Sequence, residues 1–178
     1  LDIAHEESAV IGWGGSVASH PDDLQQVGGA IRRLQAEGDW FAVVGPPQGV
    51  VEALGLDPGR FGATGTVTQL KWPYALAKLG IGIAPLADTR FNASKSFLKL
   101  LEMSALGVPW VASPRPEYQR LHAEHVGLLA DRPKDWYRLL ATLVRDKIFR
   151  MEMSQLGREV AAKHTYEVQA HRWAQAWT

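Results

Sequence analysis

The sequence has 178 residues, of which 46% are hydrophobic and 21% charged, the composition of a folded protein of ordinary domain size. Nineteen basic and nineteen acidic side chains give a net charge of zero, which argues against a nonspecific nucleic-acid binder. The chain has no cysteine for a disulfide or a thiolate metal site, and no apolar run approaches the roughly 20 residues of a membrane-spanning helix. We therefore expect a cytoplasmic domain without a transmembrane segment or a nucleic-acid partner, with peripheral attachment to the inner face of the membrane left open.

Short apolar runs alternate with segments of helical periodicity along most of the chain. The predicted strands are residues 9–12, 40–44, 61–64, 81–86, 108–112 and 126–129. The longer predicted helices between them are residues 21–37, 70–79 and 95–106. Only helices are expected after residue 133. This alternation predicts an α/β fold: a Rossmann-like, doubly wound parallel sheet of about six strands with a C-terminal helical tail.

A glycine-rich loop, Gly12-Trp13-Gly14-Gly15-Ser16, follows the first predicted strand. Consecutive backbone N–H groups in such a loop can bind an oxyanion, and ligands of open α/β sheets bind beyond the carboxyl ends of the strands. The dinucleotide fingerprint is incomplete, because its third glycine would fall at Val17 and no acid follows the second strand at Gly45-Pro46. The loop therefore predicts contacts to phosphate rather than to NAD. A turn that binds nothing is the alternative.

Two lysines begin the predicted helix 95–106. Lys95 and Lys99 would lie in its first turns, capped by Asn92 or Ser94, where the helix dipole and their mutual repulsion disfavour both charges. A bound diphosphate would reverse both penalties, so removing either lysine should leave the unliganded domain as stable or more stable. Glu102 lies on the same stripe, where a carboxylate can accept two hydrogen bonds from a vicinal diol such as ribose. The alternative is a solvated face with a Lys99–Glu102 ion pair.

Other catalytic patterns are missing from the sequence. The six histidines show no H-x-x-x-H spacing, so we expect no metal ion. No serine lies in a G-x-S-x-G elbow, and no P-loop motif is present, which argues against a serine hydrolase and a P-loop nucleotide hydrolase. Most of the seven tryptophans are expected to belong to the core.

At these residues the chain resembles the C-terminal, nucleotide-sugar-binding half of GT-B glycosyltransferases of the retaining group called family 4. Ile11 to Ser16 is similar to the first strand and phosphate loop of that half. The segment Ile81-Gly82-Ile83-Ala84-Pro85-Leu86, followed by Lys95 to Glu102 and Met103 to Ser113, is similar to the family's D-I-G-I-A-P-L … S-P-L-K-L-L-E-Y-M-A-x-G-x-P-V-V-A-S pattern. With weaker matches elsewhere, the resemblance spans nearly the whole chain.

The resemblance implies a site. The family glutamate that matches Glu102 binds the ribose hydroxyls, and the diphosphate site would comprise Gly14, Gly15, Ser16, Lys95, Ser96 and Lys99. Thr66, Asn92 and Ser94 would lie near the base or the sugar. Two departures are apparent: Ser94 replaces the first glutamate of the family's E-x7-E pair, and Gly80 replaces the aspartate that usually opens the fourth strand.

The resemblance also implies a function: transfer of a hexose-type sugar from a nucleoside diphosphate sugar to a glycan, lipid or protein acceptor, without a metal cofactor. The acceptor-binding domain with its catalytic histidine normally precedes this half, so residues 1–165 are expected to bind the donor, and residues 166–178 to form a helix that crosses to that domain. Tyr166, Ala170, Trp173 and Trp177 align along this helix, and packing on the core of the same domain is the alternative. A nucleotide-sugar epimerase and a noncatalytic nucleotide-sugar or protein-binding domain are the rival functions.

Overall fold

The structure, a computed structural model that describes residues 9–19 and 22–177, contains one six-stranded sheet with the order β3-β2-β1-β4-β5-β6. All neighbouring strands run parallel. The strands are β1 (Ile11–Gly14), β2 (Phe41–Val44), β3 (Phe61–Ala63), β4 (Ile81–Ala84), β5 (Trp110–Ala112) and β6 (Leu128–Leu129). The predicted doubly wound Rossmann-like fold is therefore confirmed.

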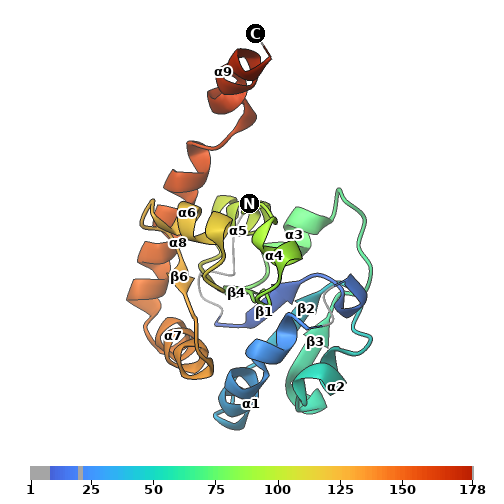
Figure 1. The fold of residues 1–178 in the computed structure, drawn as a ribbon. Coiled ribbons are helices and arrows are strands. Elements are labelled where there is room, and N and C mark those ends of the chain that lie inside the picture. Colours follow the sequence, from blue (N-terminus) through green and yellow to red (C-terminus); the bar gives the residue numbers. More distant parts are fainter. Residues whose placement is uncertain (1–8, 20–21, 178) are drawn as a thin grey trace.

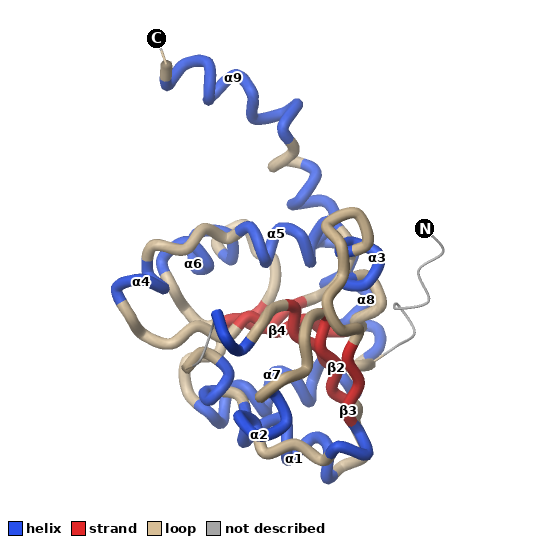
Figure 2. The backbone as a smooth tube through the Cα atoms, turned by 90° about the vertical axis from the view of Figure 1, so that its right-hand side faces the viewer, coloured by secondary structure: helices blue, strands red, loops and turns tan. Residues whose placement is uncertain are grey.

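Helices cover both faces of the sheet (Figures 1 and 2). One face packs against α1 (Gly28–Ala36), α2 (Val50–Leu54) and α7 (Pro133–Arg145). The other packs against α3 (Trp72–Leu76), α5 (Leu98–Ala105), α6 (Pro116–His122) and the second half of α8 (Lys147–Ala162). Short pieces complete the connections: α4 (Arg90–Ala93) and the 3-10 turns η2 (Val17–Ser19), η3 (Leu24–Gln26) and η4 (Pro58–Arg60). Burial on both faces explains why the central strands are apolar at every position.

Tryptophan is distributed between core and surface. Trp13, Trp110 and Trp136 are almost completely buried, as the sequence predicts. Trp40 is half exposed and Trp177 is 84% exposed.

No helix in the described ranges, 9–19 and 22–177, combines the length and hydropathy that crossing a membrane requires.

Several predicted boundaries differ from the structure by two or more residues. The first strand extends to Gly14, two residues beyond the prediction, because Trp13 and Gly14 continue the register with Val43 and Val44. The predicted helix over residues 21–37 is divided into η3 and α1, and its start at Pro21 lies outside the described residues. The strands and helices themselves are present in the predicted order.

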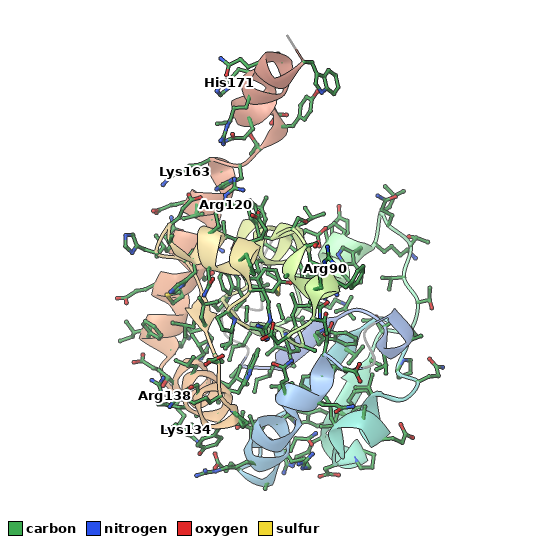
Figure 3. All side chains as sticks on the ribbon, viewed as in Figure 1. Arg90, Arg120, Lys134, Arg138, Lys163 and His171 are labelled. Carbon is green, nitrogen blue, oxygen red and sulfur yellow. The ribbon has the colours of Figure 1, made fainter. Side chains whose placement is uncertain are left out.

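The last helix, α9 (Tyr166–Ala176), extends away from the sheet and the other helices (Figures 1 and 3). Tyr166 is 78% exposed and Val168 48% exposed. The alternative that this aromatic stripe packs on the core of the same domain is therefore wrong for Tyr166 and Trp177. The side chain of Trp173 lies outside what the structure describes.

Candidate functional site

The glycine-rich loop and the segment that leads to Lys95 and Lys99 flank the point where the strand order reverses. The chain runs outward from β1 through β2 to β3, and then returns to β4 on the other side of β1. In open α/β sheets the crevice at this switch point, beyond the carboxyl ends of the strands, is where ligands bind. The loop after β1 begins at Gly15, and the loop after β4 contains residues 85–97. The fold therefore brings the predicted phosphate loop beside the predicted basic segment.

The loop after β1 lies directly against its own strand. The backbone N–H of Gly15 donates to the carbonyl of Val44, and a Cβ at Gly15 would lie 2.7 Å from the ring of Trp13. Only glycine fits this close approach without displacing the buried ring. The loop therefore presents backbone rather than side chain at the end of β1. Because the N–H of Gly15 is used by the carbonyl of Val44, an oxyanion at this place needs other donors, such as the N–H of Ser16 and nearby lysine side chains.

The loop after β4 is fixed by hydrogen bonds from other parts of the chain. The buried hydroxyl of Ser113 accepts from the N–H of Leu86 at 2.9 Å. Arg115 donates from Nε and Nη2 to the Leu86 carbonyl and forms an ion pair with Asp88 at 3.1 Å. The carboxylate of Asp23 accepts from the N–H of Ala87 at 2.8 Å. These bonds give the candidate site a rigid support.

Asn92 has a structural role in this loop. It is 4% exposed, and its Nδ2 donates to Asp23 Oδ1 at 2.7 Å and to the Ala87 carbonyl at 2.9 Å. Both amide hydrogens are used in these two bonds, so Asn92 helps to position Asp23, and its expected place near the sugar or base stays a prediction. The cap of α4 is Thr89, whose hydroxyl accepts from the N–H of Asn92.

The helix that carries Glu102 starts later than predicted. α5 begins at Leu98 with Phe97 in the capping position, so neither Asn92 nor Ser94 caps it. Lys95 lies before the helix rather than in its first turn, and the argument from an i, i+4 pair within one helix is wrong. Lys95 Nζ lies 3.5 Å from Asp23 Oδ2 and 5.0 Å from the centre of the Phe91 ring.

Lys99 is held at the end of β1 by its position in the first turn of α5. Its ammonium group lies 5.5 Å from the centre of the Trp13 ring, and the side chain is half-buried. Burial, followed by the positive charge of Lys95, lowers the pKa of Lys99 to about 8, although the carboxylates of Asp23 and Glu102 oppose the shift. A solvated face is therefore wrong for this residue. The structure places a cation where the protein itself disfavours the charge, and an anion would favour it.

Glu102 lies one turn further along α5 and is half-buried. Its Oε2 accepts a hydrogen bond from Trp72 Nε1 of α3 at 3.3 Å. Both side chains line a cavity of about 180 Å³ whose other walls are Pro73, Leu76, Ala105 and Leu106. The carboxylate is therefore accessible and already oriented by one donor.

The remaining predicted residues lie at the surface of the same region or its loops. Ser96 and Thr66 are exposed, and Ser16 is partly buried. Ser94 is exposed, and its hydroxyl donates to the Arg90 carbonyl at 3.2 Å. Their roles near the diphosphate, the base or the sugar remain predictions.

Sequence reasoning missed two residues of the site, Asp23 and Trp72. Asp23 is 3% exposed, and its partners Ala87 and Asn92 lie more than 60 positions away in the chain. An acid in a predicted helical first turn gave no sign of such contacts. Most tryptophans were expected to belong to the core, and the sequence did not set Trp72 apart from them. Its place in the site became apparent from the hydrogen bond between Trp72 Nε1 and Glu102 Oε2.

Lys95→Ala is expected to destabilise the protein by about 1–2 kcal/mol at neutral pH, between the values for exposed and buried ion pairs. The reason is that Asp23 is buried and would lose one of its compensating contacts. Urea unfolding of the variant measures the change. The sequence alone predicts an unchanged or higher free energy of unfolding, and that result would show that the pair contributes nothing to stability.

A second, larger groove lies between α7 and the start of α8. Its volume is about 700 Å³, and Tyr137, Arg138, Arg145 and Ile148 are among its lining residues. Figure 3 places Arg138 at the lower left, on α7, well away from Arg90 of α4. The groove is therefore remote from the switch point, and we do not assign the nucleotide site to it.

No protein-family model and no curated protein matches the sequence. Solved structures do match the fold. HepE from Anabaena, solved in complex with UDP and glucose, superposes with a TM-score of 0.73 at 13% identity. The match covers 98% of this chain and 50% of HepE, so the chain spans about half the length of that protein.

Two solved C-terminal domains match over most of their own length. The C-terminal domain of the glycosyl transferase group 1 family protein LpcC from Francisella tularensis gives a TM-score of 0.63 at 16% identity, covering 86% of this chain and 84% of that domain. The CMP-Kdo-binding C-terminal domain of WaaA from Acinetobacter baumannii gives 0.65 at 14% identity, covering 89% and 91%. The fold of this chain is that of the C-terminal domain of GT-B glycosyltransferases.

Proposed function

We propose that this chain is the donor-binding half of a retaining glycosyltransferase, which transfers a hexose-type sugar from a nucleoside diphosphate sugar to an acceptor. The observation that carries the proposal is Lys99. Its ammonium group is half-buried at the carboxyl end of β1, and Glu102 follows it on the same helix. A diphosphate beside Lys99 and a ribose beside Glu102 would satisfy both groups.

The proposed diphosphate site combines the loop Gly14, Gly15 and Ser16 with the two lysines, Lys95 and Lys99. The glycines let the diphosphate approach the loop closely, although the N–H of Gly15 itself donates to Val44. In the transfer, the bond between the anomeric carbon and the diphosphate oxygen breaks, and the leaving diphosphate takes the electron pair. The oxygen of the acceptor hydroxyl forms the new bond to that carbon, and the hydroxyl proton passes to a catalytic base that we propose for the second domain. The lysines are placed to stabilise the charge that develops on the diphosphate, and for this reason we propose that no metal ion is required.

The solved neighbours support a nucleotide sugar as the ligand class, because HepE was solved with UDP and glucose and the WaaA domain is described as binding CMP-Kdo. Since the chain spans half of HepE, we propose that the acceptor site and a catalytic base belong to a second domain. The exposed stripe of α9, with Tyr166 and Trp177, is the surface proposed to pack against it. On this proposal the chain alone binds the donor but does not transfer the sugar.

A thermal-shift panel of UDP, GDP, ADP, CDP and their sugars tests the proposal. A ligand at 100 times its Kd stabilises the folded state by about 2.7 kcal/mol, which raises Tm by roughly 5–10 °C in a domain of this size. We expect one base to give such a shift. Absence of a shift with every member of the panel would contradict the proposal.

Product analysis separates the transferase from its rivals. With the second domain and an acceptor present, a glycosylated acceptor is expected, whereas an epimerase would release an epimer of the donor. A noncatalytic binding domain would leave the donor unchanged under the same conditions.

A further inference from the structure

Trp72 connects the two predicted parts of the nucleotide site. Its indole N–H donates to Glu102 Oε2 at 3.3 Å. The far edge of the same ring contacts the end of β1, where a Cβ added to Gly14 would lie 3.0 Å from Trp72 Cη2. One side chain of α3 therefore touches both the proposed ribose carboxylate and the start of the proposed phosphate loop.

The surroundings of Trp72 leave its polar edge at a cavity rather than in the core. The side chain is partly buried and packs against the apolar cluster of its face of the sheet, while Trp72 and Glu102 together line the cavity of about 180 Å³. The proline at position 73, in the first turn of α3, fixes the backbone next to the ring. Packing against this apolar cluster and against Gly14 restricts the ring, so that it can orient a partner.

We propose that Trp72 is a positioning residue for recognition of the ribose, an inference that rests on the proposed function. A carboxylate at the end of a glutamate side chain rotates readily, and its two oxygens carry about four acceptor positions. The indole N–H occupies one position on Oε2 and fixes the plane of the carboxylate. Oε1 and the remaining position on Oε2 are then oriented for the two ribose hydroxyls, so less ordering is needed when the nucleotide binds.

The contact with Gly14 extends this role to the loop. Because the Trp72 ring lies against Gly14, it keeps the end of β1 and the ribose carboxylate at a fixed separation. A nucleoside diphosphate needs both at once, since its ribose and its phosphates are covalently linked. Trp72 therefore acts through Glu102 and Gly14, without itself reacting.

Calorimetric titration of the whole chain with UDP and with 2′,3′-dideoxy-UDP tests the inference; if the wild type prefers another base, the same pair with that base is used. The wild type is expected to prefer the ribonucleotide by about tenfold or more, Trp72→Phe to reduce this preference by about three- to tenfold, and Glu102→Ala to abolish it. The double variant is expected to show no preference for the ribonucleotide, like Glu102→Ala, because Trp72 acts on the ribose through that carboxylate.

Trp110→Phe is the matched control. Trp110 lies on β5, and its Nε1 donates at 2.9 Å to Oγ of Ser104 on α5, the helix that carries Glu102. This contact is in the core. This variant is expected to lose stability but to keep the wild-type preference for the ribonucleotide. In the wild type, the indole N–H resonance of Trp72 is expected to shift with UDP and much less with the dideoxy analogue, a measurement that does not depend on the folding of any variant.

An unchanged preference in Trp72→Phe, or an indole resonance that responds equally to both nucleotides, would overturn the role of Trp72 while leaving the proposed function intact. A wild-type chain that binds none of these nucleotides would overturn the proposed function, and the role of Trp72 with it.

Discussion

Glu102→Ala is expected to weaken binding of a nucleoside diphosphate by about 1.5–3 kcal/mol, or roughly 10- to 150-fold, because it removes charge-assisted hydrogen bonds to the ribose. The effect on folding is expected to be smaller. Glu102 is only half-buried, and its one bond to Trp72 lies at the wall of an open cavity. Titration calorimetry and urea unfolding of the same variant separate the two effects.

Glu152→Ala is the control for this variant, since Glu152 is exposed on α8. It is expected to change neither affinity nor stability by more than about 0.5 kcal/mol. If Glu102→Ala bound every nucleotide as tightly as the wild type, the assignment of the ribose to Glu102 would be wrong.

Lys99→Met is expected to stabilise the unliganded protein and to weaken binding of the diphosphate. Methionine keeps the length of the side chain over Trp13 but removes a charge that burial disfavours. The gain in the free energy of unfolding should be on the order of 2 kcal/mol at pH 7, somewhat less than the full pKa shift implies, because the side chain is partly exposed. The loss of affinity should be about 1.5–3 kcal/mol, since a charged hydrogen-bond donor to phosphate is removed.

The pH dependence of stability follows from the lowered pKa of Lys99. The pKa is about 8 in the folded state and 10.5 in the reference state, so the folded protein binds fewer protons between these values. The contribution of Lys99 to the free energy of unfolding therefore rises with pH from about 8 to about 10.5, and its full cost is present below pH 8. In Lys99→Met this rise should disappear, and the advantage of the variant should vanish above pH 10.5.

Lys78→Met is the control for the lysine substitution, because Lys78 is exposed after α3. It should leave both the nucleotide affinity and the pH profile of stability as in the wild type. A Lys99→Met variant that is less stable than the wild type at pH 7 would indicate that the ammonium group has a structural partner. A stabilised variant that still binds the nucleotide fully would remove Lys99 from the site.

The fold was predictable because its signals are local. Six apolar runs and the helices between them determine a doubly wound sheet, and the switch point follows from the order of the strands. The start of α5 was not predictable in the same way. Residues 94–97 continue a helical pattern in the sequence, but contacts of Lys95 and Asn92 with the distant Asp23 hold this segment outside the helix.

Part of the candidate site was likewise predictable from local sequence, and part depends on contacts between distant residues. The sequence identified Lys99 and Glu102 from their spacing on one helix, and both lie in the crevice region. Their environment depends on residues from other elements: Trp13 beneath Lys99, and Trp72 beside Glu102. Neither contact has a signature in the local sequence, because the partners come from β1 and α3. Long-range packing, rather than composition, therefore determines which lysine carries a disfavoured charge and how the carboxylate is oriented.

The most direct test of the central claim is a map of backbone amide shifts of the whole chain on titration with the preferred nucleoside diphosphate. We expect the largest shifts in residues 14–16 and 95–102, at the switch point between β1 and β4. Shifts confined to the groove between α7 and α8, at Arg138, Arg145 and Ile148, would contradict the claim.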